Sequence, residues 1–172
     1  MIDWRAILAE HGSTVWRTAY RLLDHQEDAL DCYQETFLAA LRFARTQTVL
    51  DWPAFLAGLA TRRAMDRLRQ RYRSARRSIP IDTIPEPASE RDGPVQHARA
   101  SELMERIREA MAELPEKQAE VFWLSCIEGI PHPQIAEAMT VPVGEVRVLL
   151  HRARKRLGAN LNLDELHERE MP

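Results

Sequence analysis

The sequence predicts an all-α protein made of two small helical domains that a flexible linker joins. Apolar residues recur at steps of three and four along most of the 172-residue chain, and no stretch shows the alternation typical of a strand. Residues 78–97 break this periodicity with four prolines and a glycine, a composition typical of a linker. We therefore expect helical domains at 1–77 and 99–161, a linker at 78–98 and an acidic tail at 162–172.

Composition and charge are those of an ordinary folded protein. Hydrophobic residues make up 45% and charged residues 29%, and the net charge of −2 excludes a polycation that coats nucleic acid non-specifically. Cys32 and Cys126 are too few and too distant for a metal motif or a disulfide framework, so we expect two buried thiols. The sequence has no signal peptide and no apolar run of spanning length, so we expect a cytoplasmic protein without a membrane partner.

The first domain opens with short amphipathic segments. Asp3 is placed to cap a helix that ends near Gly12, Ser13 to cap a second one, and the polar residues 24–26 to end it. In the helix that follows, the inward positions are Ala29, Tyr33, Thr36, Phe37, Ala40, Leu41 and Ala44. Asp51 caps the next helix ahead of a proline, and its buried side comprises Phe55, Leu56, Leu59, Ala60, Ala64 and Leu68.

Opposite charges are segregated on these two long helices. Asp28, Asp31 and Glu35 share one face of the first helix, with Gln34 beside them. The second helix ends in eight arginines with only Asp66 among them: Arg62, Arg63, Arg67, Arg69, Arg71, Arg73, Arg76 and Arg77. Either the acidic face and the basic end pair with each other, or the arginines form a solvated or nucleic-acid-binding surface.

The second domain ends in a pair of helices joined by a tight turn. Helical periodicity resumes with Leu103, Ile107, Met111 and Leu114, and a further helix follows from Pro115 to Gly129. Residues 131–157 form the helical pair, which residues 140–142 interrupt, and the inward positions of its second helix are Val146, Leu150, Ala153 and Leu157. Its other faces carry Arg147, His151, Arg152, Arg154, Lys155 and Arg156. This pattern is typical of a helix-turn-helix, whose second helix enters the DNA major groove; a solvated surface hairpin is the alternative.

Residue types that support catalysis are present but not arranged for it. Ser125, Cys126, His132 and His151 have no third catalytic partner and no glycine-rich loop, and the histidines lack the spacing of metal ligands. We therefore expect no enzymatic activity, no metal site and no cofactor.

Three blocks of the sequence resemble a known family. Residues 28–37 (DALDCYQETF) are similar to a DAxDLxQETF block, and residues 55–69 (FLAGLATRRAMDRLR) to a WLxxIARNxxxDxLR block. Residues 114–157 resemble LPxxxRxVxxLxxxEGxSxxEIAxxxGxSxGTVKSRLxRARxxL. These blocks, in this order and with the proline-rich linker after the second, resemble the extracytoplasmic-function (ECF) sigma factors, the small promoter-recognition subunits of bacterial RNA polymerase.

The resemblance implies partners and a role for each block. Core RNA polymerase would be bound by Asp28, Asp31, Gln34 and Glu35. The minus-ten promoter element would be melted and read by the 51–77 segment, with Thr61, Arg62, Arg63, Arg67, Arg69, Arg71 and Arg73. The minus-thirty-five element would be read by Glu145, Arg147, Val148, Leu149, His151, Arg152, Arg154 and Lys155. An anti-sigma factor is a further candidate partner, and the tether would let both modules engage at once.

The chain departs from the family pattern at two places where backbone or DNA contacts are expected. Thr61-Arg62 stand where Arg-Asn is usual, in the segment that would read the minus-ten element. Thr140 stands where the turn glycine is usual. Either that turn is not left-handed, or threonine holds it at a cost of about 1 kcal/mol or more.

A third departure lies on the second helix of the motif. Val148-Leu149 replace a Ser-Arg pair, and both are expected to point at least partly out of the core, toward thymine methyl groups or a protein partner.

Two rival functions are left open by the sequence. One is a helix-turn-helix regulator that binds an operator as a dimer without polymerase, which the acidic face argues against. The other is a sigma-like adaptor that no longer reads the upstream element.

Overall fold

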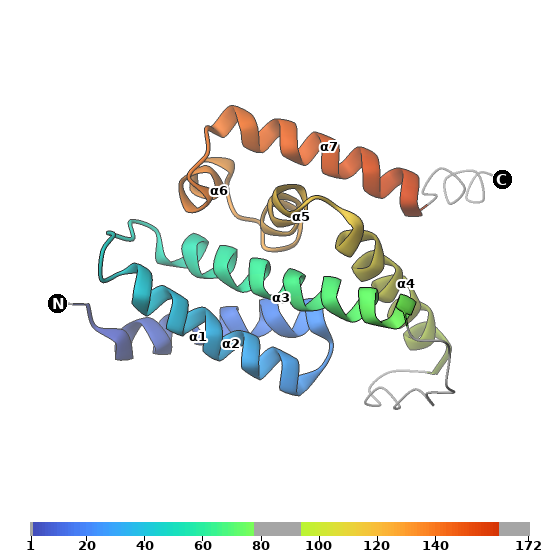
Figure 1. The fold of residues 1–172 in the computed structure, drawn as a ribbon, viewed down its shortest axis with the longest axis horizontal. Coiled ribbons are helices and arrows are strands. Elements are labelled where there is room, and N and C mark those ends of the chain that lie inside the picture. Colours follow the sequence, from blue (N-terminus) through green and yellow to red (C-terminus); the bar gives the residue numbers. More distant parts are fainter. Residues whose placement is uncertain (1, 78–93, 162–172) are drawn as a thin grey trace.

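The computed structural model describes residues 2–77 and 94–161, and all regular structure within these ranges is helical (Figure 1). The elements in chain order are α1 (Trp4–Leu23), α2 (Gln26–Phe43), α3 (Trp52–Arg77), α4 (Pro94–Glu113), α5 (Glu116–Phe122), a π-helical turn η1 (Trp123–Ile127), α6 (His132–Met139) and α7 (Val143–Leu161). The all-α prediction is confirmed. Residues 78–93 of the predicted linker and the predicted tail at 162–172 lie outside the described residues. Below, α1–α3 are called the first module and α4–α7 the second module.

The first helix is continuous where a break was predicted at Gly12. Asp3 caps α1 as expected, because its Oδ1 accepts hydrogen bonds from the backbone N–H groups of Arg5 at 3.0 Å and Ala6 at 3.1 Å. Gly12 lies buried in the middle of the helix. A β-carbon there would lie 2.9 Å from the hydroxyl oxygen of Tyr33 on α2. The prediction was wrong because this glycine permits a close approach between two helices and does not end one.

The predicted boundaries of α2 and α3 are confirmed. Asp24 adopts a left-handed conformation with φ of 50° and ends α1, and the ring nitrogen Nδ1 of His25 accepts from the N–H of Asp28 to start α2. Asp51 caps α3 by accepting from the N–H of Ala54 at 2.9 Å. The three helices pack around a core that includes Ile7, Val15, Ala40, Phe55, Leu56 and Ala60.

The second module differs from expectation at its start and in its middle. α4 begins at Pro94, so the end of the predicted linker is helical. The π-helical turn η1 adds residues to one turn and changes which side chains face inward. Trp123 and Leu124 are buried in this turn, whereas Cys126 is exposed. The predicted burial of Cys32 is confirmed and that of Cys126 is wrong, because an uninterrupted α-helix was assumed.

The helix-turn-helix is present as α6 and α7. Thr140 ends α6 in a left-handed conformation, with φ of 55° and ψ of 49°. Of the two readings of the missing turn glycine, the strained one is therefore correct. Ile135 of α6 packs with Val146 and Leu150 of α7 in one cluster, which holds the two helices together.

The two modules pack against each other through a shared core. Met65 and Leu68 of α3 lie in one buried cluster with Met111, Leu114 and Trp123 of the second module. In Figure 1, α5 and α6 lie between α7 at the top and the layer formed by α1–α3.

Polar contacts join the modules as well. Arg108 of α4 is nearly buried, donates to the main-chain oxygen of Arg21 at 3.2 Å and pairs with Asp24 at 3.1 Å. Thr18 of α1 donates to Glu128 at 2.8 Å. The sequence pattern did not predict this packing, because each module was expected to move freely on a tether.

Candidate functional site

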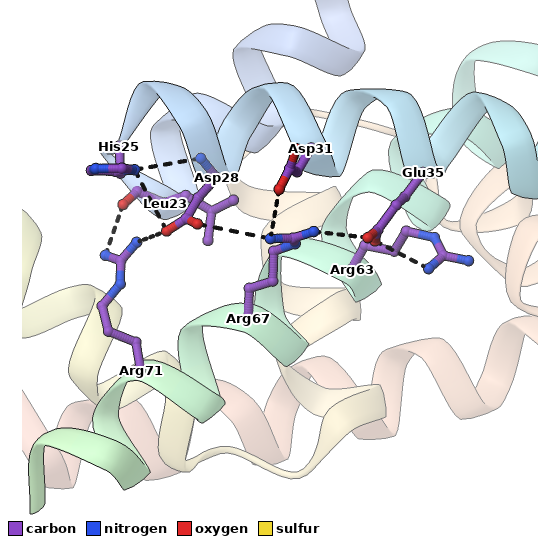
Figure 2. A network of polar contacts seen from close by, with 8 residues as sticks. All are labelled: Leu23, His25, Asp28, Asp31, Glu35, Arg63, Arg67 and Arg71. Atoms are coloured by element: carbon purple, nitrogen blue, oxygen red, sulfur yellow. Dashed lines mark hydrogen bonds and ion pairs between the residues drawn. The ribbon is translucent and has the colours of Figure 1, made fainter.

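The acidic row on α2 faces the basic face of α3 (Figure 2). Arg67 lies at the centre, with its guanidinium 2.8 Å from Glu35, 3.6 Å from Asp31 and 3.8 Å from Asp28. Arg71 pairs with Asp28 at 3.0 Å. Of the two interpretations left open by the sequence, pairing between the helices is the one that the structure shows. A network in which one guanidinium serves three carboxylates is worth more than an isolated surface pair.

Two further arginines of α3 hold the ends of this network. Arg63 pairs with Glu35 at 3.4 Å. Arg71 also donates to the main-chain oxygen of Leu23 at 2.8 Å, which satisfies a carbonyl near the end of α1. These arginines therefore stabilise the first module in the state described here.

The basic end of α3 is neutralised by α4. Arg76 pairs with Glu109 and Glu113, and the hydroxyl of Tyr72 donates to Glu105 at 2.6 Å. Burial and the carboxylates of Glu105 and Glu109 raise the pKa of Tyr72, so its hydroxyl stays protonated as the donor. Along the sequence, these eight arginines have only Asp66 among them. In the folded chain, carboxylates of α2 and α4 supply much of the missing charge.

The remaining α3 residues that were predicted to contact the minus-ten element lie in different environments. Arg69 donates to the main-chain oxygen of Leu114 at 3.3 Å, and Arg73 is exposed. Thr61 is fully buried and Arg62 pairs with Glu120 of α5 at 2.9 Å. The arginine run thus splits into residues that hold the fold together and residues that face solvent.

The face of α2 that points away from α3 carries an apolar element that sequence reasoning missed. Leu30 and Leu38 are exposed and lie one helical turn on either side of Gln34, which is also exposed. The side chain of Asp31 beside them is 61% exposed. The sequence contains a signal for this apolar surface. Leu30 and Leu38 are not among the positions predicted to face inward on this helix, so both could have been predicted to be exposed.

The outward face of α7 is basic and accessible. Exposed side chains on this helix comprise Arg147, Val148, His151, Arg152, Arg154, Lys155 and Arg156. Glu145 in its first turn pairs with Lys117 of α5 at 3.4 Å. The helix lies along the outer edge of the molecule in Figure 1, so this face is not covered by the first module.

Leu149 is a correction to the predicted outward face. Val148 is 48% exposed as expected, but Leu149 is only 8% exposed and packs with Ile135, Val146 and Leu150. The inward stripe of α7 is wider than the narrow one assumed from the sequence, because α6 and α5 both pack on the helix. An exposed apolar pair at 148–149 does not exist, and in this structure Leu149 cannot contact thymine methyl groups.

Within the described ranges, 2–77 and 94–161, His, Cys, Asp and Glu side chains nowhere cluster in threes suited to a metal ion. No helix in the same ranges is both long and apolar enough to cross a membrane.

Comparison with protein families assigns a class to this arrangement. Residues 7–74 match the family model for sigma-70 region 2, and residues 104–157 match the model for sigma-70 region 4. The first match covers most of the first module, and the second includes the helix-turn-helix of α6 and α7. The fold and these two regions together define a sigma-70-type protein.

Curated relatives narrow the assignment to one family. The chain is 31% identical over 157 residues to the ECF RNA polymerase sigma factor SigE of Mycolicibacterium smegmatis, covering 91% of this chain and 61% of that protein. It is 36% identical over 104 residues to SigD of Mycobacterium tuberculosis, covering 60% and 48%, and 30% identical over 156 residues to SigC of the same species, covering 88% and 80%. The chain belongs to the ECF family of RNA polymerase sigma factors. It spans only about half to two thirds of the length of the SigD and SigE relatives.

Solved structures agree on the fold. The sigma factor RpoE in complex with the anti-sigma factor NepR from Bartonella quintana matches with a TM-score of 0.57 at 20% identity, covering 94% of this chain and 98% of that one. CnrH in complex with the cytosolic domain of CnrY matches with a TM-score of 0.59 at 22% identity, covering 94% and 91%.

Proposed function

We propose that this chain is a transcription initiation factor that binds core RNA polymerase and directs it to specific promoters. The observation that carries the proposal is that one chain of the ECF family presents two separate recognition faces. A face with the exposed side chains of Asp31, Gln34 and two leucines lies on α2, and a basic face lies on the outer side of α7. This role needs no catalytic residue, metal or cofactor, and it places the protein in the cytoplasm beside core polymerase.

The polymerase contact is assigned to the outward face of α2. Asp31 and Gln34 are exposed polar residues on this face, and Leu30 and Leu38 extend it with apolar surface. Asp28 and Glu35 belong to the same acidic row but are also held by arginines of α3. We assign two roles to Asp28 and Glu35: their ion pairs hold α2 in place on α3, and their carboxylates also contact the polymerase.

Promoter DNA is assigned to two surfaces. Upstream duplex DNA fits the outward face of α7, where arginine and lysine side chains offer contacts to phosphate and to guanine. The minus-ten element is assigned to α3, where Arg73 is exposed in this structure. An anti-sigma factor remains a candidate regulator, in line with the complex of RpoE with NepR.

Run-off transcription tests the proposal directly. Core polymerase with the protein should produce transcripts from a subset of genomic promoter fragments that core polymerase alone does not transcribe. A stand-alone regulator would instead bind duplex DNA as a dimer and leave the transcripts unchanged. Absence of any new transcript over a genomic fragment library would contradict the proposed function.

A charge reversal separates the polymerase contact from general folding. Asp31→Arg should abolish co-purification with core polymerase, because it reverses a charge on the proposed contact face. The fold should tolerate this change, since the side chain at position 31 is largely in solvent and can turn away from Arg67. Glu10→Arg, at an acidic position on α1 that is 75% exposed, is the matched control and should bind as wild type does. Reversal of Glu35 is a poorer test, because it would place a cation between Arg63 and Arg67.

A further inference from the structure

The face of α3 that carries Thr61 and Arg62 is covered by α5. A β-carbon at Gly58 would meet Glu120 at 3.3 Å and Leu124 at 3.9 Å, both of the second module. Ala57 packs in the same buried cluster as Leu124. Thr61 lies one helical turn from Ala57 and is fully buried. Two residues assigned to the minus-ten element therefore lie at an internal interface.

Arg62 is held there by a carboxylate. Its guanidinium lies 2.9 Å from Oε1 of Glu120, whose side chain is only 4% exposed. Carboxylate and phosphate oxygens bind a guanidinium in the same way, through charge-assisted hydrogen bonds. Glu120 and a DNA phosphate would therefore compete for Arg62.

The interface also buries polar groups that water would satisfy. The Thr61 hydroxyl is buried without a hydrogen-bond partner. Burial raises the pKa of Glu120 to about 7, because the charged carboxylate is poorly solvated in the interface. Apolar contacts between Met65 and Trp123 favour closure, whereas each buried polar group favours separation. These contributions oppose each other, so the buried polar groups weaken the closed arrangement.

We propose that α5 is an autoinhibitory cover on α3, in which Glu120 occupies the position on Arg62 that a DNA phosphate takes when the cover is released. The proposal rests on the proposed DNA-binding role of α3. The outward face of α7 is exposed in the same structure, so the cover acts on the minus-ten contact and leaves upstream DNA accessible. Binding of a partner that separates the modules would free the minus-ten face of α3.

Gly58 offers a way to open the cover from one side. The atoms found within 4 Å of an added β-carbon belong to α5 and η1, so a larger side chain would push on the second module without straining α1 or α2. Gly58→Leu is the wedge, and Gly58→Ala is its matched control, because alanine adds only the β-carbon and both residues favour helix. Far-ultraviolet circular dichroism verifies that each variant is helical.

Two measurements test the cover. Small-angle X-ray scattering should show a larger radius of gyration for Gly58→Leu than for wild type and Gly58→Ala. Fluorescence anisotropy with a short labelled single-stranded DNA of mixed sequence should show tighter binding for the wedge. A gain on the order of tenfold is expected if the open state rises from about a tenth of the molecules to most of them. Adding Arg62→Ala to the wedge should remove most of that gain.

The outcomes separate this inference from the proposed function. An expanded wedge variant with unchanged DNA affinity overturns the cover. A compact wedge variant calls for Glu120→Arg, which opposes two cations at the interface, and the cover is also overturned if that variant stays compact. If wild type supports run-off transcription while neither variant gains affinity, only the cover fails. If wild type binds neither core polymerase nor promoter DNA, the proposed function fails.

Discussion

Glu120 allows a quantitative test of the interface between the modules. Burial raises its pKa from 4.5 to about 7; nearby Glu116 adds to the rise, and Arg62 and Lys117 oppose it. A carboxyl group with a raised pKa in the folded state stabilises the fold in its protonated form. That contribution is complete below the unfolded pKa and is lost as the pH rises through about 7. The shift corresponds to a free energy of about 3 kcal/mol.

The perturbation is Glu120→Gln, which has nearly the same shape as the protonated side chain and keeps an oxygen to accept from Arg62. Near pH 4, where the wild-type side chain is mostly protonated in both states, the two proteins should have about equal free energies of unfolding. By about pH 8 the variant should be more stable by about 3 kcal/mol. Urea unfolding followed by circular dichroism at several pH values measures the difference.

Glu137→Gln on α6 is the control, because Glu137 is exposed and its replacement should give no such pH-dependent gain. The opposite sign is informative. If Glu120→Gln is less stable than wild type at about pH 8, then the ion pair with Arg62 outweighs the burial of the charge, and the reasoning is refuted.

Three further substitutions test individual positions. Thr140→Gly should stabilise the protein by about 1 kcal/mol in thermal unfolding, because glycine relieves the left-handed backbone, and Thr140→Ala should recover less than half of this; no gain would mean that the turn is unstrained. Leu149→Ala should cost about 2–3 kcal/mol, whereas Val148→Ala should stay within about 0.5 kcal/mol, and equal effects would contradict the burial difference. Arg73→Ala should lower the salt slope of promoter binding by roughly one, and an unchanged slope would leave this arginine as a solvated side chain.

Local sequence signals account for most helix ends and for the helix-turn-helix. Asp51 caps α3, and the turn at Asp24 and His25 separates α1 from α2, because capping acts over a few residues that are adjacent in the chain. The inward positions Val146 and Leu150 of α7 also followed from spacing alone. Such features depend on side chains within one or two helical turns, which a sequence displays directly.

Contacts between distant residues account for what the pattern missed. Gly12 lies inside a helix, where its missing side chain lets Tyr33 of α2 approach closely, and Leu149 is inward because α5 and α6 pack on α7. Arg67 finds its three carboxylates on α2, and Arg62 finds Glu120 on α5. Neither spacing nor composition identifies such partners, because ion pairing and burial depend on which helices meet after folding. The covered state of α3 is therefore a property of the packing between modules.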